Sequence, residues 1–325
     1  MRIATFNLEN LGGEKKTAEK VQAQVETLRP QLLRLDADIV CFQEVNAKRG
    51  APGVMRGLHA LDRLLESTPY AAYSWIATTF GAKREFADKH NLVILSRWRM
   101  TDVQQIRNDL LSGPSYLSVT ADPPAEKAVA VHWDRPLLSV TIELPDGRSL
   151  HVINLHLRAP LASPVEGQKS GPFSWKTASG WAEGFYLANL KRSGQALEVR
   201  LLIDKFFDQN KDALIMVCGD FNAQIHDTPT RILCCNIEDT GNGALDSRAL
   251  VPLENSLSQS QRFTLIHNGR KQMLDHMLVS PALLAGFDRL EVHNETLGDE
   301  LVAHTSIQDS PQSYHAPIVA QFKAT

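Results

Sequence analysis

The amino-acid sequence predicts an α/β protein with mixed β-sheets. Short apolar runs bounded by turn residues recur along the chain, and segments with helical spacing lie between them. Two turn sequences, Pro-Asp-Gly at 145–147 and Asn-Gly at 268–269, are placed to join neighbouring strands as hairpins. Hairpins give antiparallel pairs and helical crossovers give parallel pairs, so both kinds are expected in one fold.

The expected strands are short and mostly apolar, which is typical of strands covered on both faces. In chain order they are residues 2–6, 37–43, 91–96, 137–144, 149–157, 213–219, 272–280 and 317–322.

Two segments have the spacing of amphipathic helices. In the first, Thr17 can cap a helix whose apolar face repeats every three or four residues through Val21, Val25, Leu28, Leu32 and Leu35. The second spans residues 183–209.

Residues 158–182 are predicted to form a loop, because this stretch is rich in proline and glycine. The loop follows an expected site strand, so we expect it to overhang the site. Its residues Trp175, Lys176 and Trp181 would stack a base or cover a head group; alternatively, the tryptophans anchor the loop to the domain.

The length suggests one large domain or two modest ones, and since no repeat or linker divides the sequence we expect one domain over residues 1–325. The chain is 43% hydrophobic and 22% charged, and its formal net charge of −3 gives no general attraction to nucleic acid. The start of the chain does not resemble a signal peptide, and no apolar run reaches the ~20 residues of a membrane span. Four cysteines without a Cys-x-x-Cys pair favour free thiols in a reducing cytoplasm.

Polar residues with chelating side chains recur where the apolar runs end. They are Asn7, Glu9, Glu44, Asn154, His156, Asp220, Asn222, Asp275, His276 and His315. Glu9 and Glu44 offer hard oxygen ligands, which suit Mg²⁺ or Mn²⁺.

Alternation along the strands separates these residues into faces. Asp220 and Asn222 share one face, where a carboxylate can hold a water and an amide can donate to a phosphoryl oxygen. Asp275 lies in an apolar run and needs a partner if it is buried. His276 would then point to the opposite face, where we expect it to be exposed. A histidine paired with a carboxylate completes the requirements for phosphoester hydrolysis.

Six blocks of the sequence resemble the endonuclease/exonuclease/phosphatase superfamily, the deoxyribonuclease-I-like group. They are FNLENL (6–11), FQEV (42–45), INLHL (153–157), GDFNA (219–223), LDHMLVS (274–280) and YHAP (314–317), in the family's order. The resemblance implies a four-layered α/β sandwich, in which helices flank two packed mixed sheets. It also implies divalent-metal-dependent cleavage of phosphodiesters or phosphomonoesters.

The resemblance further implies a role for each matching residue. Glu44 would be the main metal ligand, with Glu9 near the metal. Asn7 would help to position the phosphate or the ligand. His156 would contact the phosphate, and Asn222 would stabilise it. Asp220 would hold or deprotonate the attacking water. Asp275 would orient His315, and His315 would stabilise the transition state or assist proton transfer.

One position departs from the family pattern, which has an aspartate where this chain has Tyr314. In the resemblance that aspartate lies near the metal. We therefore predict retained activity with metal affinity weakened by ~10–100-fold, unless Asp309 substitutes for it. A metal titration in which Tyr314→Asp binds no more tightly would contradict this prediction.

The sequence leaves the substrate open among three functions: a phosphodiesterase or nuclease, which we favour, a small-molecule phosphomonoesterase, and a catalytically weakened binding module. Basic pairs are scattered along the chain, and those at 48–49 and 83–84 lie where they could meet phosphate. Arg192 and Arg200 share a helix face and are expected to form salt bridges.

Overall fold

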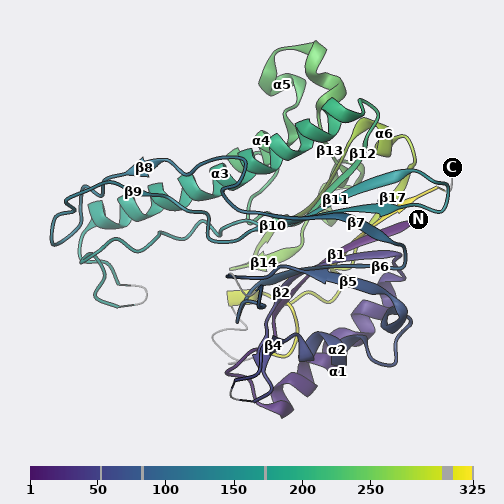
Figure 1. Ribbon diagram of the computed structural model, residues 1–325, viewed down its shortest axis with the longest axis horizontal. Helices are drawn as coiled ribbons and strands as arrows, with labels where there is room; N and C mark the ends of the chain where they lie inside the picture. The colour runs from purple at the N-terminus through teal and green to yellow at the C-terminus, as the bar shows by residue number, and fades with distance from the viewer. Residues whose placement is uncertain (52, 82–83, 172–173, 302–309, 324–325) are drawn as a thin grey trace.

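Two β-sheets pack face to face in the computed structural model, and helices cover their outer faces (Figure 1). The structure describes residues 1–51, 53–81, 84–171, 174–301 and 310–323. The order helix, sheet, sheet, helix gives four layers, so the predicted fold class is confirmed. No helix in these ranges is long and apolar enough to cross a bilayer.

The first sheet contains the first and last strands of the described chain and has six strands in the order β17-β18-β1-β2-β6-β5. Its strands are β1 (Arg2–Leu11), β2 (Ile39–Val45), β5 (Ser74–Ala77), β6 (Asn91–Ser96), β17 (Phe287–Val292) and β18 (Ile318–Phe322). The β1–β2 pair is parallel, and the other pairs are antiparallel.

The second sheet also has six strands, in the order β13-β16-β12-β11-β10-β7. They are β7 (Met100–Ile106), β10 (Leu137–Glu143), β11 (Ser149–His156), β12 (Leu214–Asp220), β13 (Val251–Pro252) and β16 (Asp275–Val279). The expected hairpin at 145–147 joins β10 to β11, and β11 pairs in parallel with β12.

Three apolar clusters hold the layers together. One lies between the sheets and includes Ile39, Ile94 and Met216. The other two lie under the helices of the outer layers. Asn154 links the two sheets through its amide, which accepts from Gln43 at 2.7 Å and donates to two carbonyls of the first sheet. One domain over residues 1–325 stays a prediction.

The helices and the short elements lie at the periphery (Figure 1). Helix α1 (Ala18–Leu35) buries the predicted apolar face, and its N-terminus is capped by Thr17 as expected. The other helices are α2 (His59–Leu65), α3 (Ala178–Gln209), α4 (Thr228–Cys234), α5 (Ile237–Thr240) and α6 (Pro281–Leu284). The 3₁₀ helices are η1 (Pro69–Ala72), η2 (Gly243–Arg248), η3 (Leu253–Ser256) and η4 (Gln259–Gln261). Among the described residues, three small two-stranded sheets pair β3 (Lys48–Arg49) with β4 (Arg56–Gly57), β8 (Ser115–Tyr116) with β9 (Val129–Ala130), and β14 (Leu265–His267) with β15 (Arg270–Gln272).

Helix α3 extends well beyond the edge of the second sheet (Figure 1). Two buried glutamates on this helix bind the long segment between β7 and β10. Glu198 accepts backbone N–H groups of Asn108 and Leu110, and Glu183 accepts those of Val119 and Thr120. Since a carboxylate can accept several hydrogen bonds, each glutamate fixes a stretch of chain that has no regular strand partner.

The predicted loop at 158–182 is shorter than expected, because α3 already begins at Ala178. Thr177 caps this helix by accepting the Gly180 N–H, and that cap sets the start. Trp175 packs against Gly184 on α3, which favours the anchoring alternative for this residue. Trp181 is a helical residue, 46% exposed, whose ring stacks on Phe185.

Candidate active site

Strand register in the second sheet places three predicted site residues side by side. His156 on β11 pairs with Asp220 on β12, and Asp220 pairs with Asp275 on β16. Directly paired residues point to the same face of a sheet. Gly219 makes this close pairing possible, because its φ is +135° and a Cβ there would lie 2.0 Å from the Leu155 carbonyl oxygen.

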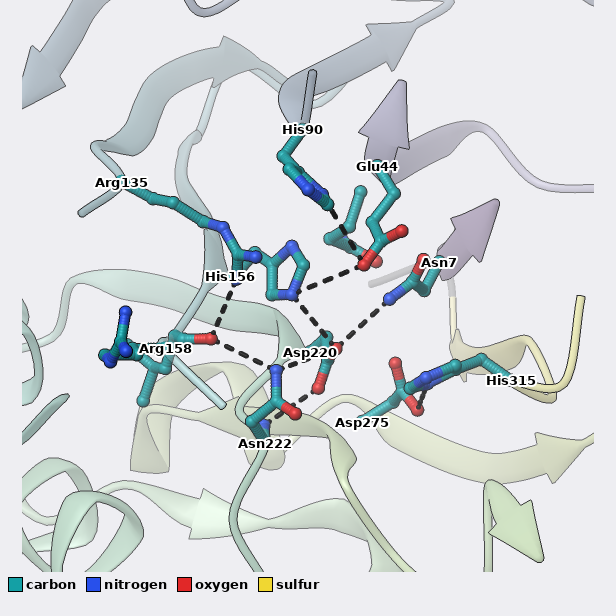
Figure 2. Close-up of polar contacts among 12 residues, drawn as sticks. Asn7, Glu44, His90, Arg135, His156, Arg158, Asp220, Asn222, Asp275 and His315 are labelled. Atoms are coloured by element: carbon teal, nitrogen blue, oxygen red, sulfur yellow. Dashed lines mark hydrogen bonds and ion pairs between the residues drawn. The ribbon is translucent and has the colours of Figure 1, made fainter. Parts of the chain in front are cut away.

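Asp220 is the centre of a buried hydrogen-bond network (Figure 2). Its Oδ2 accepts from Asn7 Nδ2 at 3.1 Å and from Asn222 Nδ2 at 3.1 Å, and its Oδ1 accepts the Asn222 N–H at 2.8 Å. Burial raises the pKa of Asp220 to about 7, and the neighbouring Asp275 adds to this effect. A carboxyl group with a pKa near neutrality is suited to accept a proton at physiological pH.

His315 forms the predicted pair with Asp275, whose Oδ2 lies 2.8 Å from His315 Nδ1 (Figure 2). The Ser313 hydroxyl holds the preceding turn by donating to the Asn7 carbonyl at 2.8 Å and accepting the His315 N–H at 3.0 Å. Burial opposes a charge on the imidazole, but the attraction of Asp275 outweighs it. The pKa of His315 is therefore raised well above its usual range.

Glu44 lies at the end of β2 between two imidazoles, those of His90 and His156 (Figure 2). Its Oε1 is 3.6 Å from His90 Nδ1 and 3.7 Å from His156 Nε2, and His156 Nε2 is also 3.3 Å from Asp220 Oδ2. Although burial would raise the pKa of Glu44, His90 and His156 hold it well below the usual range. The sequence reasoning did not include His90, because this residue precedes a strand, whereas the other residues were identified where apolar runs end.

Glu9 lies close to this group but faces a different partner. Its carboxylate accepts the backbone N–H of Tyr314. Tyr314, the residue that departs from the family pattern, therefore contacts Glu9 through its main chain. Burial raises the pKa of Glu9. The Tyr314 side chain is buried rather than open to a substrate, and Asp309, the suggested substitute acid, lies outside the described residues.

Four of these residues have left-handed backbone conformations, which are uncommon for side chains other than glycine. The φ angles are +46° at Glu9, +60° at Glu44, +58° at His90 and +48° at Asn222. Strand pairing is irregular around the first two, between Asn7 and Leu11 on β1 and between Phe42 and Val45 on β2. Irregularities of this kind redirect side chains, and they concentrate at functional sites.

Two arginines border the network. Arg135, which the sequence reasoning missed, precedes β10, is directed toward Glu44 and Asp220, and donates to the Leu157 carbonyl at 3.2 Å (Figure 2). Arg192 was expected to form a salt bridge, but its guanidinium instead donates to the Asn222 carbonyl. It therefore helps to fix Asn222, whereas Arg200 forms the expected ion pair, with Asp204 at 2.5 Å.

A pocket of about 790 Å³ opens beside His90 and Arg135. Five cationic side chains and three carboxylates line it: Arg56, Lys89, Arg107, Arg135 and Arg158 against Glu85, Asp88 and Asp134. Phe80, which is 60% exposed, contributes a ring that lies 5.3 Å from the Arg107 guanidinium. The pocket therefore combines positive charge with an aromatic face, although the predicted contact Lys83 lies outside the described residues.

His276 is buried, and the prediction that it would be exposed is wrong. Its Nε2 lies 2.7 Å from the Ala223 carbonyl and its Nδ1 contacts Glu254, so both ring nitrogens face acceptors and the ring is an imidazolium. Burial lowers its pKa, but Glu254 outweighs burial and the pKa is raised above its usual range. This ion pair holds the GDFNA segment from the side opposite the site.

We expect His276→Leu to lower the free energy of unfolding by about 3–5 kcal/mol, because Glu254 would remain buried without its partner. A raised pKa means that the wild-type contribution is complete below pH ~6.5 and is lost as the pH rises through the folded-state value. Urea unfolding between pH 6 and 9 measures both effects. The double variant Glu254→Leu/His276→Leu should recover much of the loss, and a single variant as stable as wild type would contradict the pairing.

Comparison with known proteins agrees with this architecture. The family model described as Endonuclease/Exonuclease/phosphatase family matches residues 4–295. A search of curated proteins gives no match.

Solved structures with the same fold cover nearly all of the chain. D. rerio TDP2 complexed with a single-strand DNA product has a TM-score of 0.54 and 14% identity, with 100% of this chain and 99% of that chain covered. The 3′ phosphatase NExo from Neisseria, bound to a product DNA hairpin, gives 0.51 and 17%, with both chains fully covered. The human Nocturnin catalytic domain with bound sulfate gives 0.52 and 15%, covering 99% and 94%.

Proposed function

The chain belongs to the endonuclease/exonuclease/phosphatase family, and we propose that it is a divalent-metal-dependent phosphodiesterase or nuclease. Its general class is that of hydrolases acting on phosphoester bonds. The observation that carries the proposal is the convergence of residues from both sheets (Figure 2). Glu44 and His315, which shortly precedes β18, come from the first sheet, and they meet Asp220 and Asp275 from the second.

Glu44 and Glu9 would hold the cation, Mg²⁺ or Mn²⁺. The fit rests on Glu44 Oε2, which is buried and has no hydrogen-bond partner among the described residues, and on the hard oxygen donors of both side chains. When bound, the ion neutralises charge on a phosphate oxygen.

Asp220 would position the attacking water and take up its proton. The amides of Asn7 and Asn222 fix the Asp220 carboxylate, so the acceptor oxygen is held in place before the substrate arrives. Arg135, directed toward the same carboxylate, supplies positive charge beside the phosphate. Asn222 and His156 complete the predicted contacts to the phosphate.

His315 would act from the opposite side of Asp220 as a cation. Asp275 keeps the imidazole charged and oriented, and a positioned imidazolium stabilises negative charge that develops on the phosphoryl oxygens or on the leaving group. Asp220 and His315 would thus have separate roles, with Asp220 as the base and His315 as the acid.

The pocket beside the site favours a diester that extends past the reacting phosphate. Its arginines can pair with a second phosphate, and Phe80 can stack a base. Because TDP2 and NExo are described with DNA products, nucleic acid is the substrate class that we favour.

The free cysteines Cys41, Cys218 and Cys234 are buried, which supports the predicted reducing cytoplasm.

The test is hydrolysis of bis-p-nitrophenyl phosphate beside p-nitrophenyl phosphate with Mg²⁺ or Mn²⁺, comparing wild type with His315→Ala. Diester cleavage that is lost in His315→Ala supports the proposal, and the exposed His59→Ala serves as the matched control. Monoester cleavage alone would assign the protein to the phosphatases. If neither ester is hydrolysed with either metal, the protein is better described as a catalytically weakened binding module, and the proposal is wrong.

Salt dependence distinguishes a nuclease from a small-substrate enzyme. Binding of an oligonucleotide releases counterions, so its observed affinity should fall steeply as salt rises. Binding of a mononucleotide should change much less over the same range.

A further inference from the structure

His90 is placed at the site by its own backbone rather than by a regular strand. Its φ of +58° is left-handed, and its N–H donates to Asn46 Oδ1 at 2.9 Å. The next residue, Asn91, donates to the Val45 carbonyl at 2.9 Å and so fixes the strand end. Two amide contacts thus maintain a backbone conformation that most residues disfavour. This conformation directs the His90 imidazole toward Glu44 (Figure 2).

The spacing of Glu44, His90 and His156 does not fit hydrogen bonding. The two contacts to Glu44 Oε1 are 3.6 Å and 3.7 Å, which exceed the usual range for a hydrogen bond. Glu44 Oε2 and His90 Nδ1 are buried and have no hydrogen-bond partner within the described ranges. Buried polar atoms without partners are costly, so this cluster is incomplete as a set of protein groups alone.

The same spacing fits three ligands of one ion. One atom from each residue lies within 4.8 Å of the others. Two ligand atoms each about 2.1 Å from a tetrahedral ion would lie roughly 3.4 Å apart, close to the separations in this cluster. The three residues come from separate segments: Glu44 from β2, His90 from the loop directly before β6, and His156 from β11.

We propose that His90 and His156 join Glu44 as metal ligands, so that the site prefers a first-row transition ion such as Zn²⁺ to Mg²⁺. Two imidazole nitrogens and one carboxylate oxygen form a donor set that suits Zn²⁺ or Co²⁺, whereas Mg²⁺ favours oxygen and water. The proposal rests on the proposed function only in that Glu44 holds the cation. It gives His156 a ligand role in place of the expected phosphate contact.

The test is calorimetric titration of the metal-free protein with Zn²⁺ and, separately, with Mg²⁺. His90→Gly removes the imidazole and leaves a residue that accepts the left-handed backbone without strain. Wild type should bind Zn²⁺ at least about 100-fold more tightly than Mg²⁺. His90→Gly should bind Zn²⁺ at least roughly 10–100-fold more weakly than wild type, which is the loss that follows removal of a supporting residue at metal sites. Its Mg²⁺ affinity should be nearly unchanged. His59→Ala, which removes an exposed imidazole, is the control.

Two further measurements make the outcome decisive. The visible absorption of bound Co²⁺ reports its coordination and should change in His90→Gly but not in His59→Ala. His90→Asn repeats the test with another residue that tolerates positive φ, in case the glycine disturbs the loop. Unchanged Zn²⁺ affinity and Co²⁺ spectrum in both His90 variants would overturn the proposal. That result would leave the proposed function, diester hydrolysis with Mg²⁺, unaffected. A wild-type protein that binds no divalent ion would overturn the proposed function as well.

Discussion

Replacing Asp220 with asparagine is expected to lower kcat for diester hydrolysis by about 10²–10⁴-fold, the range associated with loss of a positioned general base. Asparagine keeps the shape of the side chain, and its one carbonyl oxygen can still accept from the side-chain amides of Asn7 and Asn222. It loses the second oxygen, which accepts the Asn222 N–H, and it cannot take a proton from water. Steady-state kinetics in saturating metal measures the effect. KM should change little, because the substrate contacts remain.

Folding stability provides the second readout for this variant. Burial and the neighbouring Asp275 both disfavour the charge on Asp220, so removing it should leave the thermal midpoint unchanged or higher. The control is Asp212→Asn, since Asp212 is an exposed acid just before the same strand. An Asp220→Asn variant that is active to within a few-fold of wild type would rule out the base assignment.

Asp275→Asn should have nearly the effect of His315→Ala, about 10²–10⁴-fold in kcat, because the two residues act as one unit. The double variant should lose no more than the larger single loss, since groups that act together are not additive. A double-mutant cycle on kcat measures this coupling, and two losses that multiply would contradict the pairing.

The pH profile separates positioning from mere structural support in Asp275→Asn. Asp275 raises the pKa of His315, so the imidazolium is present below that raised value and is lost as the pH rises through it. Without the carboxylate the pKa falls, and the alkaline decline in kcat should move to lower pH. A variant that is slow but keeps the wild-type pH profile would show that Asp275 only supports the fold.

The strands that sequence reasoning found are those in the interior of the sheets, such as β2, β6 and β12. These have apolar residues on both faces, and the pattern is therefore unmistakable. Strands β5, β7 and β17 were missed because they lie at sheet edges, where polar and exposed residues interrupt the apolar run.

The candidate site could be predicted where a chelating residue directly follows or ends an apolar run, as at Glu44 and Asp220. His90 and Arg135 precede their strands, and their inward direction depends on local backbone geometry that no periodicity encodes. His276 was predicted to be exposed because side chains alternate along a strand, and one face of the strand was taken to be in contact with solvent. Both faces of β16 are covered, because Met277 packs into the core between the sheets and Leu278 packs into the apolar cluster under the outer helices.

The central claim is that this site directs a water molecule to phosphorus. Single-turnover hydrolysis of a phosphodiester in H₂¹⁸O, followed by mass spectrometry of the products, tests it most directly. Wild-type enzyme with a divalent metal should place ¹⁸O in the phosphate product, and Asp220→Asn should give almost no labelled product in the same time. Label in the alcohol product, or labelling of phosphate at the wild-type rate by Asp220→Asn, would contradict it.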